Sequence, residues 1–525
     1  MSSGLHHWVS EAARIRPDAR AVVGEDDTIT YGELEAYSNR LAAILRAQGC
    51  EKGDRVAVLM PNSARAVGSL IGILKAGCAY VPLDPGGATA RTAAMIRQCE
   101  PRALLARDGA PEVLRDLDSR GALDSIACGW LGREDPPRAM AFTLTDIEGA
   151  SAEASPSDVG PDDLAYILFT SGTTGAPKGV PITHGSVRTF VDWAVQHFEL
   201  GPHDRLSGHT ALTFDLSTFD IYATFAAGAE LHHVPKRARL MPHELSDFIH
   251  DRGLTLWFSV PSQLAYVARF DALDGRSFPS LRHVAWCGDV LPTPVLLYWK
   301  RKLSEVTFTN LYGPTEATVA SSYYEVPEDF EDPTADIPIG TACAGERLLV
   351  LNEDLRPVAE GEAGDVYIGG VGLSPGYWRD LERTQAAFVS DPEASNGGGR
   401  LYRTGDRGRL GSDGMVHFLG RADFQIKASG YRVEPGEVEN AILGLDEVAA
   451  CAVVAVTVDD FNGSAIGCVY VASNGAPLPV GEVKKRLADA LPSYMVPTRW
   501  LGVDDLPVDS RGKIDRTRAR ALLEA

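Results

Sequence analysis

Residues 55–83 read RVAVLMPNSARAVGSLIGILKAGCAYVPL. Positions 55–60 have the continuous apolar character of a buried strand, positions 64–76 repeat their apolar residues at helical spacing, and positions 79–83 again resemble a strand. Strand, helix and strand in this order form the unit of a parallel sheet that is covered by helices. We therefore predict an α/β fold.

The same alternation returns along the chain. Short apolar runs at 164–169, 254–259, 283–287 and 307–311 each lead into a polar or glycine-containing loop. In open parallel sheets such strand ends form the ligand site. From 328 to 419 the helical pattern gives way to short strands broken by glycine, and after 420 the segments 436–443, 450–456, 466–472 and 480–491 are typical of a compact α+β unit.

These changes of pattern predict the domain organisation. We expect a large core over 1–420, made of α/β subdomains over 1–327 and a small β-rich subdomain over 328–420. A hinge is expected at 421–424, and a small, mobile α+β C-terminal lid domain over 425–525.

Composition excludes several classes of protein. The chain has 525 residues, 45% of them hydrophobic, and 50 Lys and Arg against 71 Asp and Glu give a net charge of −21. A field of this sign repels polyanions, so we expect no nucleic acid partner. The eight cysteines include no close C-x-x-C pair, which argues against a disulfide framework or a thiolate zinc site. The first 17 residues lack the apolar region of a secretory signal, and no apolar run approaches the ~18 residues of a membrane span, so we expect a cytoplasmic protein without a membrane partner.

The strongest single motif is a loop suited to phosphate. Residues 166–179 read YILFTSGTTGAPKG, a strand followed by glycines, hydroxyl residues and Lys178. Glycines let backbone N–H groups approach an anion, while the hydroxyls and the lysine add donors and charge. The alternative is a solvated glycine turn. A Walker A loop does not fit, because Lys178 follows Pro177 and precedes Gly179.

Further motifs follow in chain order over nearly the whole sequence. They are TYGEL (30–34), LKAGCAYVPLDP (74–85), FDLS (214–217), NLYGPTE (310–316), the glycine-rich segment 364–378, YRTGD (402–406), the segment 420–439 and the segment 506–516. With the phosphate loop, these motifs resemble the adenylate-forming superfamily of acyl-CoA synthetases, firefly luciferase and nonribosomal peptide synthetase adenylation domains.

The resemblance implies ATP and Mg²⁺ as cofactors. It implies Lys513, Thr315 and Glu316 as catalytic residues, with Glu316 also the metal ligand and Thr315 a contact of the α-phosphate. By the same resemblance, the ATP-binding residues are Thr170, Ser171, Gly172, Thr173, Thr174, Gly175, Lys178, Asn310, Tyr312, Gly313, Asp406 and Arg421. Each of these three residues also has a purely structural alternative. Glu316 would then be a surface residue, Tyr312 a core residue and Lys513 a solvated charge near a terminus.

The segment 420–434 is similar to the family hinge. The resemblance makes Asp423 the pivot and implies that a loop with Lys427 and Gly430 replaces Lys513 at the active site when the lid rotates. One lid orientation would then serve adenylation and the other thioester formation. The alternative is a simple linker.

The substrate is suggested by Asp215. In peptide synthetase adenylation domains the aspartate of this motif pairs with the α-ammonium group of the amino acid, and a buried carboxylate needs such a partner. The alternative is a helix N-cap. The other pocket positions, carried over by motif offset, are Leu216, Phe219, Ser259, Ala285, Cys287, Gly288, Leu311, Val319 and Ala320. Their uncharged lining indicates a small to medium neutral amino acid, with alanine first and proline or a β-amino acid next.

The expected enzyme is an amino acid adenylating ligase that forms aminoacyl-AMP and loads a carrier protein. Because no carrier or condensation motif is found, we expect a stand-alone acyl or peptidyl carrier protein as partner, which supplies the phosphopantetheine thiol in natural-product biosynthesis. Residues 484–525 hold nine Lys and Arg against six Asp and Glu and are the candidate docking region. The alternatives are an acyl- or aryl-CoA ligase of the same superfamily and a non-catalytic amino acid sensor. Aminoacyl-tRNA synthetase motifs are not found.

Overall fold

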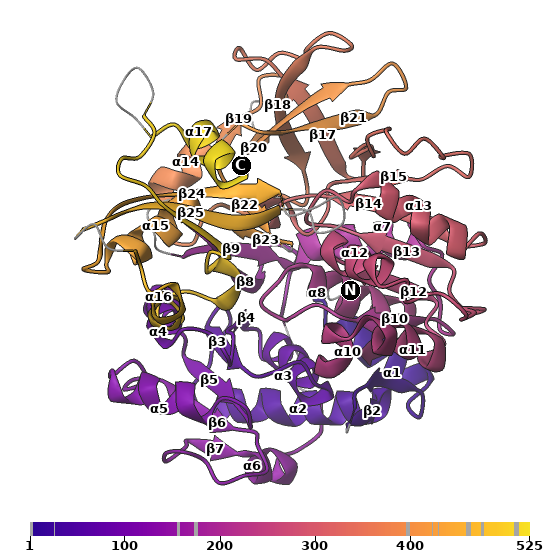
Figure 1. The fold of residues 1–525 in the computed structure, drawn as a ribbon. Helices are drawn as coiled ribbons and strands as arrows, with labels where there is room; N and C mark the ends of the chain where they lie inside the picture. The colour runs from indigo at the N-terminus through magenta and orange to yellow at the C-terminus, as the bar shows by residue number, and fades with distance from the viewer. Residues whose placement is uncertain are drawn as a thin grey trace.

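The computed structural model describes residues 4–25, 27–154, 158–172, 177–394, 399–422, 424–428, 430–457, 464–473, 477–508 and 514–524. The predicted site residues Thr173, Thr174, Gly175, Asp423 and Lys513 lie outside the described residues. Figure 1 shows a large N-terminal part, a β-rich part at the top and the C-terminal part, in orange and yellow, lying across the larger one. The predicted α/β class is confirmed.

The first large sheet is parallel except at one edge. In spatial order it contains β7 (Phe142–Thr143), β6 (Ala127–Trp130), β5 (Ala103–Ala106), β3 (Arg55–Leu59), β4 (Ala79–Pro82), β8 (Leu164–Thr170) and β9 (Lys178–Thr183). The accompanying helices are α2 (Tyr31–Ala47), α3 (Ala64–Lys75), α4 (Thr89–Cys99), α5 (Pro111–Ser119) and α6 (Leu144–Gly149). Strands β8 and β9 pair antiparallel with Thr170 opposite Lys178, so the predicted phosphate loop connects them at the end of the sheet.

The second large sheet supplies most of the site. In spatial order it contains β16 (Thr341–Ala342), β15 (Ser322–Glu325), β14 (Thr307–Tyr312), β13 (His283–Trp286), β12 (Leu256–Ser259), β10 (Arg205–Gly208), β11 (Glu230–His233), β1 (Arg20–Val23) and β2 (Thr28–Thr30). Strands β14 to β1 pair parallel, and the strands at both edges pair antiparallel. The carboxyl ends of β12, β13 and β14 therefore meet at one edge.

Helices surround this sheet and join it to the first. They are α1 (His7–Ile15), α7 (His184–His197), α8 (Leu216–Thr218), a π-helical turn (Phe219–Ala223), α9 (Thr224–Ala227), α10 (Lys236–Leu240), α11 (Pro242–Arg252), α12 (Pro261–Arg269), α13 (Thr293–Lys302) and a 3₁₀ turn (Thr315–Ala317). One hydrophobic core runs between the sheets, from Leu34 and Leu70 to Phe219 and Phe258. Burial of this continuous apolar surface makes the large part a single rigid support for the strand ends.

A β-rich sheet follows in the chain, as predicted. It contains β17 (Glu346–Leu351), β18 (Ala363–Gly370), β20 (Arg400–Leu410), β19 (Phe388–Ser390) and β21 (Val416–Arg421), all antiparallel, with helix α14 (Leu381–Ala387) beside it. The pairing of β20 with β18 and β21 is irregular around Gly405 to Gly408. Such a bulge re-aims side chains, and here it lies at Asp406.

The C-terminal part has a core of its own. It contains β22 (Ile426–Ala428), β23 (Tyr431–Val433), α15 (Pro435–Leu443), β24 (Val448–Thr457), β25 (Ser464–Ala472), α16 (Val480–Leu487), a 3₁₀ turn (Ser493–Met495), β26 (Arg499–Gly502) and α17 (Arg516–Glu524). Val438, Val453, Cys468 and Val483 pack together inside it. We call this part the lid. No helix in the described ranges combines the length and apolarity needed to cross a membrane.

Candidate active site

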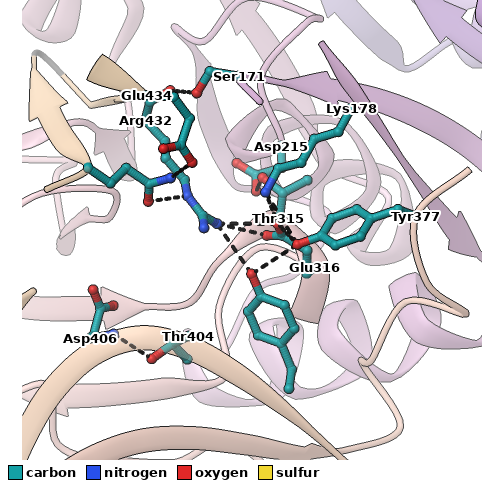
Figure 2. Close-up of polar contacts among 12 residues, drawn as sticks. Ser171, Lys178, Asp215, Thr315, Glu316, Tyr377, Thr404, Asp406, Arg432 and Glu434 are labelled. Carbon is teal, nitrogen blue, oxygen red and sulfur yellow. Dashed lines mark hydrogen bonds and ion pairs between the residues drawn. The ribbon is translucent and has the colours of Figure 1, made fainter. Parts of the chain in front are cut away.

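Glu316 lies at the centre of the site, in the 3₁₀ turn that follows β14. Its carboxylate is fully buried and accepts a hydrogen bond from the Tyr377 hydroxyl at 2.8 Å. The Lys178 ammonium lies 3.1 Å and the Arg432 guanidinium 3.0 Å from its oxygens, and Figure 2 shows both cations beside the carboxylate. Burial raises the pKa of Glu316, but Arg432 and Lys178 together hold that pKa well below its usual range. This carboxylate therefore stays charged and bound to cations.

Lys178 is the first residue of β9 and is nearly buried. Burial lowers the pKa of its ammonium group, although the Glu316 charge opposes this change. The ammonium also lies 3.2 Å from the Tyr377 hydroxyl and over the Tyr377 ring. Ring and carboxylate thus fix a positive charge beside the end of the predicted phosphate loop.

Three of the predicted ATP-binding residues, Tyr312, Asp406 and Arg421, come together as a second cluster. The Tyr312 hydroxyl donates to Asp406 at 2.7 Å, and Arg421 donates to the other oxygen of this carboxylate at 2.5 Å. Lys427 of the lid lies 3.9 Å from Asp406, and its ammonium lies over the Tyr312 ring. Tyr312 is packed in the core, as the simpler alternative expected, but its ring also borders the cavities of the site.

Asp215 is buried and faces the same space. The Thr315 hydroxyl donates to its carboxylate at 2.6 Å. Burial raises the pKa of Asp215 to about 6. Asp215 precedes α8 at the N-cap position, but its side chain makes no capping hydrogen bond. The geometry therefore favours an aspartate available to a cation over a helix cap.

The segment between Gly313 and Ala320 is strained. Thr318 and Val319 have φ angles of 54° and 69°, which β-branched residues rarely adopt. A Cβ at Gly313 would lie 2.6 Å from Ala320 Cα, so the chain folds back on itself only because residue 313 is glycine. The Thr318 hydroxyl donates to the Gly372 carbonyl at 2.6 Å and holds the turn. Such strain persists where the surrounding structure fixes a functional geometry.

Lid residues enter the site through the β22–β23 hairpin. Gly430 lies at its turn with a φ of 83°, and a Cβ there would lie 2.3 Å from Val260 Cγ1. The Gly430 carbonyl approaches the position of Gly288, and the Tyr431 ring stacks on Tyr494 with centroids 3.7 Å apart. The hairpin that holds Lys427 and Gly430 therefore faces the core, and its role in thioester formation stays a prediction.

Other predicted ATP-binding residues contact the lid or the backbone. The Ser171 hydroxyl donates to the Arg432 carbonyl at 2.6 Å, and the Gly172 N–H lies 3.3 Å from the Glu437 carboxylate. Asn310 donates to the Pro338 carbonyl at 2.8 Å. Thr170 has a buried hydroxyl at the end of β8, with no hydrogen-bond partner among the described residues.

Most of the predicted substrate residues are buried, and two of them line a cavity with Asp215. Leu216 and Gly288 line a cavity of about 50 Å³ together with Asp215 and Thr315, and Leu311 lines an adjoining cavity of about 180 Å³. The remaining predicted pocket residues, all buried, are Phe219, Ser259, Ala285, Cys287, Val319 and Ala320. The Ser259 hydroxyl is engaged by Trp257 Nε1 at 3.0 Å, and the Phe219 ring packs 4.7 Å from that of Phe258. Their assignment to the substrate stays a prediction.

Sequence reasoning missed residues that hold the charged centre. Tyr377 and Arg432 contact Glu316 directly, and Tyr402 lies within 3.4 Å of both. Glu437 at the start of α15 pairs with Arg91 of α4. The four residues that sequence reasoning missed lie inside motifs already identified from the sequence; they are Tyr377, Tyr402, Arg432 and Glu437. The motifs alone did not indicate which side chains meet.

Comparison with known proteins agrees with this geometry. The family model described as AMP-binding enzyme matches residues 9–378, and the AMP-binding enzyme C-terminal domain matches residues 437–513. The chain belongs to the AMP-binding enzyme family. This enzyme is 35% identical over 509 residues to the L-proline–[L-prolyl-carrier protein] ligase of Streptomyces coelicolor, with 95% of this chain and 93% of that protein covered.

Longer relatives and solved structures point to the same family. The enzyme is 32% identical over 512 residues to bacitracin synthase 1 of Bacillus licheniformis; this covers 98% of the chain but only 9% of that protein's length. Among solved structures, the Vibrio cholerae adenylation domain AlmE in complex with glycyl-adenosine-5′-phosphate superposes with a TM-score of 0.84 at 26% identity, covering 100% of this chain and 98% of that one. The two family models together match residues in both the core and the lid of this chain.

Proposed function

We propose that the chain activates a small to medium neutral amino acid, alanine first, as aminoacyl-AMP and transfers it to the phosphopantetheine thiol of a separate carrier protein in natural-product biosynthesis. The observation that carries this proposal is Asp215, a buried carboxylate that lines the cavity of the site between Phe214 and Leu216. A buried anion of this kind is offset best by a cation, and the α-ammonium group of an amino acid supplies one.

The residues present fit Mg²⁺ bound together with nucleotide phosphates. Glu316 offers one hard, ionised oxygen ligand, and no group of three or more His, Cys, Asp or Glu in the described parts of the chain forms a dedicated metal cage. Mg²⁺ prefers this arrangement, because it keeps water and takes its other ligands from substrate phosphates. When bound, the metal would neutralise phosphate charge.

The chain's own residues would position two anions that repel each other. In the first step a carboxylate oxygen of the amino acid bonds to the α-phosphorus of ATP, and the bond to pyrophosphate breaks. Lys178 and Thr315 would hold the phosphates, and Asp215, whose carboxylate lies 2.6 Å from the Thr315 hydroxyl, would hold the ammonium group. Asp406 would accept the ribose hydroxyls beside Tyr312. Lys513 is assigned to the charge that develops between the two reactants.

The second step would use the lid orientation described above. In it the carrier's thiol loses its proton, a carbon–sulfur bond forms, and the bond between the acyl group and AMP breaks. Gly430 lies against Gly288 and Val260, and this contact with the core supports a role of the hairpin in transfer. Lid rotation between the two steps fits a hairpin that contacts the site through small residues and reversible ion pairs.

Proline is the second candidate for the substrate, because the Streptomyces coelicolor relative is named an L-proline ligase. Proline carries a secondary ammonium group, which Asp215 can also bind. β-Amino acids remain as a further alternative. A CoA ligase would have the same nucleotide-binding residues but would not need Asp215, because its substrate carries no ammonium group. An amino acid sensor would bind the amino acid without forming an adenylate.

Amino acid-dependent exchange of pyrophosphate into ATP tests the activation step. We expect exchange with alanine or another small neutral amino acid from a panel of proteinogenic and β-amino acids. Intact-protein mass spectrometry then tests the acceptor, by mixing enzyme, amino acid and ATP with phosphopantetheinylated carrier protein or with CoA. A thioester on the carrier supports the proposal, acyl-CoA supports the ligase alternative, and no exchange with any amino acid supports the sensor.

A further inference from the structure

Arg432 is a lid residue that binds the buried carboxylate of the core. Its Nη1 atom lies 3.0 Å from Glu316 Oε2 and 3.3 Å from Glu316 Oε1. Figure 2 shows the Arg432 guanidinium directed at Glu316. The Tyr402 hydroxyl lies 3.4 Å from the same nitrogen of Arg432. A guanidinium in this place forms a charge-assisted contact with both carboxylate oxygens.

Several contacts fix Arg432 in this place. Its Nε atom donates to the Gln425 side chain, and its carbonyl accepts from the Ser171 hydroxyl at 2.6 Å. Further along the lid, Glu437 pairs with Arg91 and accepts from the Gly172 N–H. Both ends of this short segment therefore lock onto the core beside the phosphate loop, and the Arg432 contact depends on the lid orientation.

Glu316 cannot serve this guanidinium and a divalent cation together. A magnesium ion sits about 2.0–2.1 Å from its oxygen ligands. Both Glu316 oxygens already lie within 3.3 Å of Arg432 Nη1, and the Lys178 ammonium lies 3.1 Å from Oε1. A dication placed on either oxygen would meet two fixed positive charges in a buried, weakly screened site, so one cation must leave.

We propose that Arg432 takes the place of the divalent cation on Glu316, so that the lid docks in this orientation only after the metal has left with pyrophosphate. Arg432 is then a positioning residue that makes the transfer orientation conditional on product release. The order of steps rests on the proposed function, whereas the competition between Arg432 and the metal does not. Returning Mg²⁺ and pyrophosphate displace the guanidinium and undock the lid.

The test follows the lid directly. All eight cysteines are buried, so a surface pair introduced by Arg301→Cys and Asp489→Cys can be labelled and its distance measured by paramagnetic resonance. The probes are Mg²⁺ alone, pyrophosphate with a chelator, and Mg²⁺ with pyrophosphate. We expect only the last mixture to shift the distance away from the value of the docked lid.

Variants separate this role from a merely structural one. Arg432→Met should need on the order of tenfold less Mg²⁺ for the same shift, because a hydrogen bond between charged groups no longer competes. Arg432→Lys should fall between Met and Arg. Arg486→Met is the matched control, since this exposed lid arginine pairs only with Glu447 of the lid among the contacts described, and it should behave as the parent. Unchanged far-ultraviolet circular dichroism and melting temperature show that each variant folds.

Two outcomes overturn the inference. In the first, Mg²⁺ with pyrophosphate leaves the label distance of the parent unchanged; in the second, Arg432→Met requires as much Mg²⁺ as the parent. Neither measurement contains an amino acid or a carrier protein. Absence of amino acid-dependent exchange would therefore overturn the proposed function and leave this inference standing. Either of the two outcomes above would overturn this inference and leave the proposed activation of an amino acid standing.

Discussion

At the scale of single residues, the site is a set of buried charges that need partners. Asp215 and Glu316 are both carboxylates enclosed by the core, but their surroundings push their pKa values in opposite directions. Glu316 has two cations beside it and stays ionised. Asp215 has a hydroxyl beside it and takes up a proton near neutral pH. This difference matches a permanent ligand for cations and a recognition group for a substrate that brings its own charge.

The first prediction concerns the pH dependence of amino acid binding. Burial raises the pKa of Asp215 from 3.8 to about 6, so the free enzyme protonates this carboxylate as the pH falls through about 6 and loses its attraction for the ammonium group. In pyrophosphate exchange, kcat/KM for the amino acid should be constant above this pH and fall below it. Asp215→Asn should lower kcat/KM by about two to three orders of magnitude and remove the inflection. An inflection that survives in this variant would assign it to another group.

The second prediction concerns Lys513, which lies outside the described residues. Lys513→Ala should slow adenylate formation by roughly two to three orders of magnitude, the scale of losing one preorganised charge. Transfer from preformed aminoacyl-AMP should change much less, because Lys513 is assigned to the adenylation step alone and the β22–β23 hairpin to transfer. Pyrophosphate exchange and single-turnover transfer measure the two steps separately. Unchanged exchange would remove the assignment.

At the scale of elements, the β22–β23 hairpin is the point where lid and core meet. Its turn requires glycine at position 430 for two reasons: the φ angle there is 83°, and a Cβ would lie too close to Val260. Gly430→Ala should therefore slow transfer by about tenfold or more while exchange stays within a factor of about two, because only the transfer orientation uses this contact. Gly414→Ala is the matched control: Gly414 has a φ of 76°, and a Cβ at this position would meet nothing within 4 Å. Equal losses of transfer rate in both variants would mean that backbone strain alone, and not the contact with Val260, causes the effect.

Elements with a strong apolar period could be predicted from the sequence. Strand β3, helix α3 and strand β4 lie within one residue of the expected ranges, because their side chains are buried on a regular period. The expected segment 480–491 of the α+β unit contains helix α16, which ends at Leu487 because the chain turns ahead of Pro492. Strand β20 was not predicted, because Gly405 and Gly408 in its middle resemble a loop and instead mark the bulge at Asp406.

The site could be predicted only in part, for a physical reason. Motifs identified Glu316, Asp215, Tyr312 and Asp406, whose side chains the structure brings into one region. They did not indicate that Thr315 contacts Asp215, or that Arg432 contacts Glu316. These contacts join segments 100 and 116 residues apart, and the second depends on one lid orientation, which a linear pattern does not encode.

At the scale of the whole molecule, charge is distributed unevenly. A net charge of −21 repels an acidic carrier protein, whereas the lid's C-terminal part is locally basic. Lys484 and Lys485 of α16 are partly and fully exposed. Lys484→Glu with Lys485→Glu should raise KM for the carrier several-fold at low salt and leave exchange unchanged, with the effect fading as salt screens the charges. Arg115→Glu with Arg133→Glu, exposed on the core, is a control of equal charge change. If both pairs of substitutions raise KM for the carrier equally, the effect reflects the net charge of the protein and not docking at α16.

The most direct measurement compares the best amino acid of the exchange panel with its analogue that lacks the amino group, such as alanine with propionate. If Asp215 recognises an ammonium group, the amino acid should be preferred by about 10³-fold or more in kcat/KM, because the analogue leaves a buried carboxylate unpaired. Asp215→Asn should collapse this ratio toward one. Equal exchange with both compounds in the parent enzyme would contradict the account.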